Sequence, residues 1–230
     1  MKLPFTVEQF FAVFGVYNTA IWPMQLVAYG LGILALALAW RENKPSGRII
    51  GGILAFFWLW MGIFYHLVHF SAINQAAWVF GIFFVVQGLL FFLAGVIFNK
   101  FAFEFALKPL PVIGAIFIVY AMVIYPIIGV NLGHSYPQAP MFGVAPCPAT
   151  IFTFGILLWA SKPVPGYLLV IPLLWALVGM SAAVNLNVPQ DYGLVVAGVV
   201  GAILIMIRNR KWKNLARQNP GGEPRGADGR

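Results

Sequence analysis

Seven apolar stretches, separated by linkers that hold most of the charged residues, dominate the chain from residue 23 onward. They cover residues 23–40, 49–70, 77–98, 110–131, 149–160, 166–184 and 192–207. A helix of about 20 apolar residues crosses the roughly 30 Å of hydrocarbon in a bilayer. Most stretches reach or approach this length, although 149–160 is too short for a simple crossing. The pattern predicts an all-α integral membrane protein, a seven-span helical bundle.

The composition supports the membrane class. Hydrophobic residues make up 61% of the 230 residues and charged residues only 9%, whereas soluble domains contain about 25% charged residues. Soluble enzymes, secreted disulfide scaffolds, disordered proteins and nucleic-acid-binding proteins are therefore excluded. The net charge of +8 does not indicate a nucleic-acid partner, because the basic residues lie between the apolar stretches and in the tail. A single cysteine, Cys147, excludes an intrachain disulfide bond.

The positions of lysine and arginine predict the orientation. All of them except Lys2 lie in alternate linkers and in the C-terminal tail. Because basic residues accumulate on the cytoplasmic side, the N-terminus is expected outside and the C-terminus in the cytoplasm. Residues 1–207 form one predicted transmembrane domain. Residues 208–230 are expected to be a basic and then disordered tail, since the sequence from Asn214 onward lacks apolar periodicity and is rich in glycine and proline.

A short amphipathic helix on the outer membrane surface is predicted before the first apolar stretch. Thr6 is placed to cap this helix, Gln9 to complete a capping box, and Phe5 to pack against Phe10. The apolar residues of the helix share one stripe: Val7, Phe10, Phe11 and Phe14.

Most residues capable of acid–base or metal chemistry fall at predicted outer ends of the spans. The candidate ligand-binding residues are His66, His69, Asn74, His134, Cys147 and Asp191. His66 and His69, spaced three apart, would share one α-helical face and could hold a metal ion such as zinc or copper. His134, Cys147 or Asp191 could add a third ligand. The alternative is that both histidines are interfacial side chains bonded to neighbouring carbonyl groups.

The linker GHSYPQAPMFGVAPCPAT is uncharged and proline-rich, which indicates a loop folded onto or into the bundle. Because the fifth stretch is short, Cys147 is expected below the outer membrane boundary. With Pro148 at the first helical position, Cys147 would cap the helix, where a thiolate is favoured. The alternative is an inert, buried thiol.

Asp191 is expected in the first turn of the last helix, where the helix dipole favours a carboxylate. Since the last apolar stretch is also short, Asp191 is a functional candidate below the membrane surface. The alternative is that it only helps the helix to begin.

Four stretches resemble a family of bacterial multi-pass inner-membrane proteins of unknown function: FTVEQFFAVFGVYNTAIWP, YHLVHFSAIN, GHSYPQAPMFGVAPCPATIFTFG and NVPQDYGL. The resemblance covers nearly the whole chain except the tail. It implies a bacterial inner membrane and carries over no catalytic residue, because the family has no established activity.

Three functions stay open. The favoured one is a binding or transport protein whose outward-facing vestibule, built from the six candidate residues, takes up a metal ion or a small polar ligand. The second is a structural or accessory subunit of a membrane complex, with a homo-oligomer or another membrane protein as partner. The third is a metal-dependent hydrolase, although the HExxH and GxSxG motifs are absent and no motif supports an enzyme.

Overall fold

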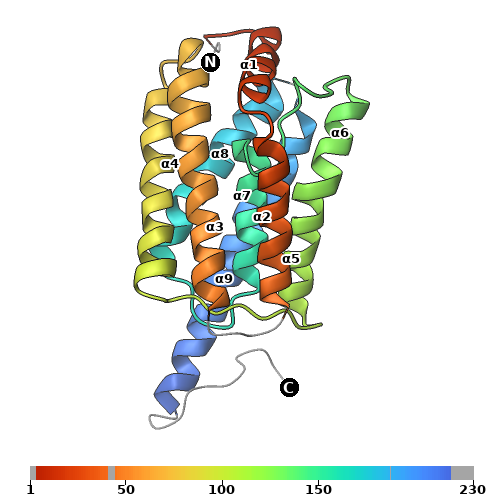
Figure 1. Cartoon of the computed structure of the whole chain (residues 1–230). Helices are drawn as coiled ribbons and strands as arrows, with labels where there is room; N and C mark the ends of the chain where they lie inside the picture. The colour runs from red at the N-terminus through yellow and green to blue at the C-terminus, as the bar shows by residue number, and fades with distance from the viewer. Residues whose placement is uncertain (1–3, 41–44, 187, 219–230) are drawn as a thin grey trace.

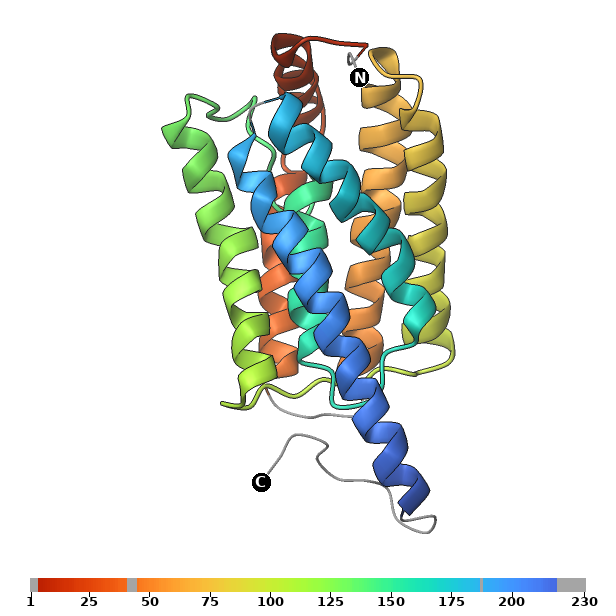
Figure 2. The same ribbon diagram turned by 180° about the vertical axis from the view of Figure 1, so that it is seen from behind.

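The computed structural model describes residues 4–40, 45–186 and 188–218, and within them the chain folds into a bundle of roughly aligned helices (Figures 1 and 2). The helical elements follow in the order α1 (Val7–Ala20), α2 (Met24–Ala39), α3 (Ser46–Trp60), η1 (Met61–His69), η2 (Phe70–Ala72), α4 (Ala77–Phe91), η3 (Phe92–Ile97), α5 (Pro109–Val119), η4 (Tyr120–Ile124), α6 (Tyr125–Asn131), α7 (Pro146–Leu158), η5 (Gly166–Leu169), α8 (Val170–Asn185), η6 (Pro189–Asp191) and α9 (Tyr192–Gln218).

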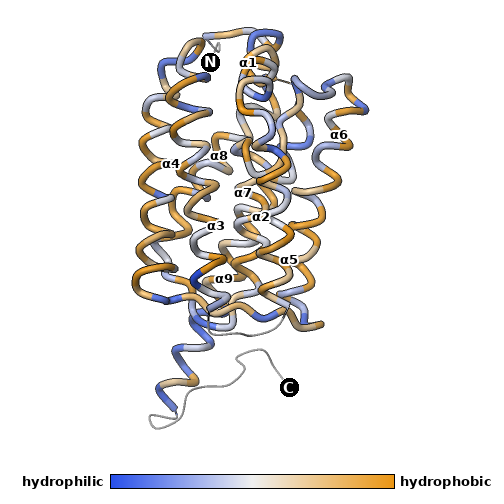
Figure 3. Tube along the Cα trace, viewed as in Figure 1, coloured by the Kyte–Doolittle hydropathy of each residue, from blue (hydrophilic) through white to orange (hydrophobic). Residues whose placement is uncertain are grey.

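Among the described residues, five continuous helical segments are long and apolar enough to cross a membrane. They are Ser46–Ala72, Ala77–Ile97, Pro109–Asn131, Gly166–Asn185 and Pro189–Gln218. A sixth crossing is possible if α1 and α2, which are bent by 85° relative to each other, act as one broken span. The all-helical class and the membrane character are thus confirmed. Figure 3 shows the polar segments at the two ends of the bundle and along the end of α9.

The short helix α7 lies at the centre of the bundle. Twelve of its 13 residues are buried, and it packs against α3, α5, α8 and α9. Contact with α5 is backbone to backbone, because a Cβ atom at Gly155 would lie only 2.8 Å from the Gly114 carbonyl oxygen. Neighbouring helices therefore surround α7 and shield its backbone from lipid.

Helix α7 begins earlier than the sequence predicts. Pro146 takes the first helical position and Ala145, in an extended conformation, is the N-cap. The expectations that the helix begins at residue 149 and that Cys147 is its N-cap are wrong. The physical reason is that the fixed φ of Pro146 suits the first turn as well as that of Pro148 does. Cys147 is consequently the second residue of the helix.

A side chain from α9 donates hydrogen bonds to the carbonyl groups at the C-terminal end of α7. Arg208 is buried, and its Nη1 donates to the carbonyl oxygens of Leu157 and Leu158 at 3.1 and 3.2 Å. The last carbonyl groups of a helix have no intrahelical partner, so this arginine compensates for them inside the protein.

The predicted capping box at the start of α1 is confirmed. The Gln9 N–H donates to Thr6 Oγ1 and the Thr6 N–H donates to Gln9 Oε1. The ring of Phe5 stacks on that of Phe10 with 6.1 Å between centroids. Phe10, Phe11 and Phe14 are buried against the rest of the bundle, so α1 covers one end of it, named here the α1 end.

The predicted folding of the 133–150 linker onto the bundle is also confirmed. Asn18 of α1 is fully buried, and its Nδ2 donates to the carbonyl oxygens of Pro137 and Ala139 at 2.6 and 2.8 Å. The Tyr17 hydroxyl donates to the Val144 carbonyl oxygen at 2.9 Å. Two α1 side chains thus donate hydrogen bonds to carbonyl oxygens of the linker, which buried backbone groups require.

The tail differs from the prediction up to residue 218. Helix α9 continues through Gln218, so residues 214–218 are helical and not disordered. This segment, NLARQ, contains good helix formers, and elongating an existing helix avoids the cost of nucleation. The remainder of the predicted disordered tail, residues 219–230, lies outside the described residues.

Candidate functional site

A pocket of about 340 Å³ lies at the α1 end of the bundle, over the N-terminus of α7. We name it the aromatic pocket, because seven of its lining residues are aromatic: Phe5, Phe10, Phe14, Tyr65, Phe70, Phe80 and Trp175. Its polar lining residues include Asn74, Cys147, Ser181 and Asp191. Figures 1 and 2 show that α7 stops short of the end of the bundle that η1 and α6 reach.

Asp191 supplies the carboxylate of the pocket. Its side chain is only 1% exposed. The Tyr125 hydroxyl donates to Asp191 Oδ1 at 2.7 Å, and the Cys147 thiol donates to Oδ2 at 3.5 Å. Within the described residues no lysine or arginine pairs with this carboxyl group. Any negative charge on Asp191 is therefore stabilised by two neutral donors, and no cation among the described residues balances it.

The N-terminus of α7, which faces the pocket, offers few hydrogen-bond donors. Pro146 and Pro148 have no N–H group, and the Ala149 N–H already donates to the Ala145 carbonyl oxygen at 3.3 Å. Anion sites at helix starts use several free N–H groups in the first turn. The two prolines remove most of these donors, so the arrangement is poorly suited to an anion.

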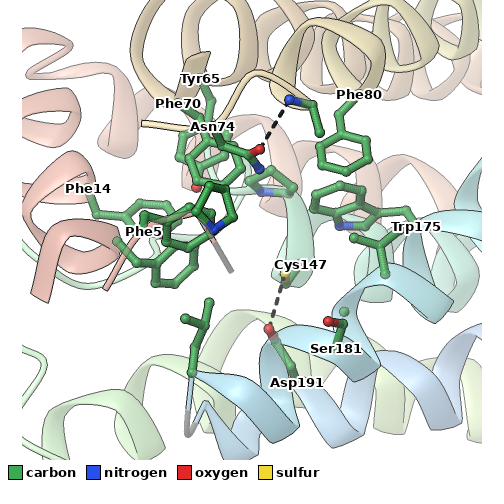
Figure 4. Close-up of a pocket in the computed structure, with 17 residues that line it drawn as sticks. Phe5, Phe14, Tyr65, Phe70, Asn74, Phe80, Cys147, Trp175, Ser181 and Asp191 are labelled. Carbon is green, nitrogen blue, oxygen red and sulfur yellow. Dashed lines mark hydrogen bonds between the residues drawn. The ribbon is translucent and has the colours of Figure 1, made fainter. Parts of the chain in front are cut away.

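Aromatic rings line two sides of the pocket. Figure 4 shows Phe5 and Phe14 on one side, Phe80 and Trp175 on the other, and Cys147 with Asp191 between them. Phe14 stacks on Tyr65 with 4.9 Å between ring centroids and an interplanar angle of 20°. Such packing holds the two rings in fixed orientations. The face of an aromatic ring carries negative partial charge.

Three of the six predicted ligand-binding residues line this pocket: Asn74, Cys147 and Asp191. Asp191 and Cys147 contact each other directly. Asn74 Oδ1 accepts a hydrogen bond from the Ala76 N–H at 3.1 Å, just before α4 begins. The side chain of Asn74 therefore helps to form the turn that precedes α4 as well as lining the pocket.

The three predicted histidines lie in three different surroundings. His66 is fully buried, with its ring 4.6 Å from that of Phe84 and 5.1 Å from that of Trp175 between centroids. His69 is half-buried, and its Nδ1 lies 2.7 Å from the Phe64 carbonyl oxygen. None of the three histidines lines the aromatic pocket.

His134 stacks on Phe11 with 3.5 Å between ring centroids and an interplanar angle of 11°. Burial lowers the pKa of His134 below its ordinary value, because desolvation disfavours the charged imidazolium. The ring is therefore held in its neutral form as part of the contact between α1 and the linker that precedes α7.

The structure gives no support to the predicted metal site at His66, His69 and His134. Among the described residues no group of three or more histidine, cysteine, aspartate or glutamate side chains is placed to hold a metal ion. His66 and His69 lie in η1, which is π-helical. In this geometry the i, i+3 spacing no longer brings two side chains onto one face as it does in an α-helix.

Comparison with protein families identifies the chain. The profile of a family of unknown function, DUF6064, matches residues 7–217. The chain belongs to the DUF6064 family. The match confirms the resemblance seen in the sequence motifs. No curated protein and no solved structure matches the chain.

Sequence reasoning missed Tyr125 and the aromatic walls of this DUF6064 site. Tyr125 is 1% exposed and lies within the predicted span 110–131. A tyrosine inside an apolar span needs a partner for its hydroxyl group. That signal could have marked Tyr125 as a neighbour of a polar residue, although it could not have identified Asp191 as the partner.

Proposed function

We propose that this protein binds a small organic cation, such as an alkylammonium or quaternary ammonium compound, in the aromatic pocket. The observation that carries the proposal is the buried Asp191 carboxyl group, which receives hydrogen bonds from Tyr125 and Cys147 but has no cationic partner among the described residues. An ionisable residue within a membrane-spanning segment has a high free-energy cost, and it usually has a functional role.

Charge balance favours a cation over the other ligand classes. A buried carboxylate is costly unless a cation or several donors compensate for it, and a bound ammonium group would complete that compensation. A metal ion would require further oxygen, nitrogen or sulfur ligands. An anion would face Asp191 without the free N–H groups that usually hold it.

The aromatic lining supports the same class of ligand. Cation–π interactions with Trp, Tyr or Phe contribute about 0.5–2 kcal/mol each, and aromatic cages recognise quaternary ammonium groups. Phe5 and Phe14 face Phe80 and Trp175 across the pocket (Figure 4). A cation between these rings would lie close to Asp191 and would keep its methyl groups in an apolar environment.

The centre of the bundle favours binding over conduction. Beyond Cys147, every residue of α7 is buried, and the hydroxyl groups of Thr150 and Thr153 donate to backbone oxygens of their own helix. A ligand that reaches Asp191 therefore meets a packed helix and no polar path through the bundle.

The membrane arrangement that accompanies this proposal has seven spans, with α2 and α7 crossing together with the five longer segments. The N-terminus and the aromatic pocket then lie outside and α9 ends in the cytoplasm, as the basic residues favour. The resemblance to bacterial inner-membrane proteins makes that membrane the proposed location. The ligand would reach the pocket from the periplasmic side.

Calorimetric titration of the detergent-purified protein with choline tests the proposal. Choline should bind, whereas 3,3-dimethylbutan-1-ol, which replaces the quaternary nitrogen by carbon, should not. Asp191→Asn keeps the shape of the side chain but removes the charge, and it should weaken choline binding by about 30-fold or more, because losing one partner of a buried charge pair costs about 2 kcal/mol or more.

Tyr125→Phe is the matched control, because it removes a neutral donor to Asp191 but keeps the carboxylate. It should weaken choline binding far less than Asp191→Asn does. Equal binding of choline and its neutral analogue, or full choline affinity in a folded Asp191→Asn variant, would refute the proposal.

A further inference from the structure

A second depression lies on the outside of the bundle, between α4 and α8, and has a volume of about 390 Å³. We name it the α4–α8 groove. Its lining is apolar throughout and includes Phe83 of α4 with Leu174 and Leu177 of α8. These three side chains are 45%, 48% and 55% exposed. Because both helices belong to candidate membrane spans, the groove faces the hydrocarbon of the bilayer.

The α4–α8 groove adjoins the aromatic pocket. Phe80, Trp175 and Val178 line both. The rings of Phe80 and Trp175 are 5.4 Å apart between centroids, at an interplanar angle of 75°. These shared side chains lie at the border between an outer space with hydrophobic lining side chains and an inner space whose lining includes Asp191, so the two spaces are neighbours.

We infer that the α4–α8 groove holds the hydrocarbon chain of the cation whose ammonium group binds at Asp191. The ligand class is then a single-chain amphiphilic ammonium compound that enters from the side of the bilayer. This inference rests on the proposed function and adds the substrate class to it. The occupant of the groove is apolar, because all the lining side chains are hydrophobic, the indole nitrogen of Trp175 is buried, and the surrounding medium is lipid.

The dimensions fit such a ligand. The lining residues of α8 run from Ile171 to Val178, which corresponds to about 10 Å along the helix axis. A chain extended along this length would continue from the Phe80–Trp175 boundary down the outside of the bundle. A short cation without a chain would occupy the aromatic pocket alone.

The test compares choline, which has no chain, with decyltrimethylammonium on the detergent-purified full-length protein. Leu177→Trp should fill the groove without changing the aromatic pocket, which Leu177 does not line. The variant should weaken decyltrimethylammonium binding about tenfold or more, since each methylene removed from an apolar contact costs about fourfold in affinity. Its affinity for choline should be unchanged.

Val86→Trp is the matched control. Val86 lies on α4, is 39% exposed, and lines neither the groove nor the pocket. This variant should bind both cations as the wild type does. In a second measurement, a decyltrimethylammonium analogue with a terminal diazirine should label peptides of α4 and α8 after illumination, and choline in excess should prevent the labelling.

The outcomes separate the two proposals. If choline binds in an Asp191-dependent manner but Leu177→Trp affects both cations equally or neither, the groove does not hold the chain and only the inference fails. Labelling confined to other helices would have the same meaning, as expected if ordinary bilayer lipid fills the groove. If neither cation binds in an Asp191-dependent manner, the proposed function and the inference both fail.

Discussion

Asp191 and His66 are both buried polar residues within helical segments, but their surroundings differ. Both oxygens of Asp191 accept a hydrogen bond. Neither ring nitrogen of His66 has a hydrogen-bond partner among the described residues, and aromatic rings surround the imidazole. Hydrogen bonds compensate for the cost of removing the Asp191 carboxyl group from water, but nothing comparable compensates for burial of the His66 ring nitrogens. At the scale of single residues, the proposed cation site therefore uses Asp191, whereas we expect His66 to contribute to packing among the aromatic rings.

His66→Phe is accordingly expected to raise the free energy of unfolding by about 1 kcal/mol, because the variant no longer buries polar atoms without partners. Choline binding should be unchanged, since His66 does not line the aromatic pocket. Chemical unfolding in mixed detergent micelles, together with elemental analysis of the purified protein, checks this prediction. Loss of a stoichiometric metal ion on substitution would instead establish His66 as a ligand.

At the scale of elements, the position of α7 creates the site. The helix is short and starts at Pro146. Space therefore remains between Cys147 and the α1 end of the bundle, and residues of α1, α4 and α8 enclose this space. Its close approach to α5 at Gly114 and Gly155 fixes its position in the bundle. Small residues allow helix backbones in a membrane protein to pack at such short distances.

Gly155→Ala should therefore lower the free energy of unfolding by about 1–3 kcal/mol, because the added methyl group would push α7 away from α5. Gly30→Ala is the matched control on α2, where an added Cβ would meet no atom within 4 Å. There the substitution should stabilise the protein by about 0.5–1 kcal/mol through its helix propensity. Equal effects of the two variants in mixed-micelle unfolding would contradict this account of α7 packing.

At the scale of the whole molecule, polar and basic segments divide between the two ends of the bundle. Helix α1 and the linker before α7 lie at one end, and the basic turns of α9 lie at the other (Figures 1 and 3). The aromatic pocket belongs to the first end, because residues of α1 and of the start of α7 line it. The proposed orientation, with the pocket outside and the C-terminal segment in the cytoplasm, rests on this division.

Cysteine labelling tests this orientation, in a Cys147→Ala background that removes the native thiol. Ser135 and Asn214 are both exposed. Ser135 lies in the linker that follows α6 and Asn214 in the last turns of α9, and these two segments are at opposite ends of the bundle (Figure 1). A membrane-impermeant maleimide added to spheroplasts should label Ser135→Cys, and it should label Asn214→Cys only after lysis. The reverse pattern would invert the proposed topology.

The sequence by itself determined the helices, the membrane class, the capping box of α1, and the burial of the linker before α7. These features depend on apolar content, segment length and contacts between residues a few positions apart, all of which can be read along the chain. It also placed Cys147 and Asp191 at one end of the bundle. It did not predict the π-helical geometry at His66 and His69, because nothing in the local pattern distinguished a π-helical segment from an α-helical one.

Only the tertiary structure decided how the site is built. Asp191 meets Cys147 and Tyr125 across 44 and 66 residues of chain, and the aromatic walls come from segments as far apart as Phe5 and Trp175. Such contacts depend on how helices pack around the short central helix α7. Helix periodicity fixes which face of one helix is apolar, but packing between helices decides which side chains share a pocket and which remain apart.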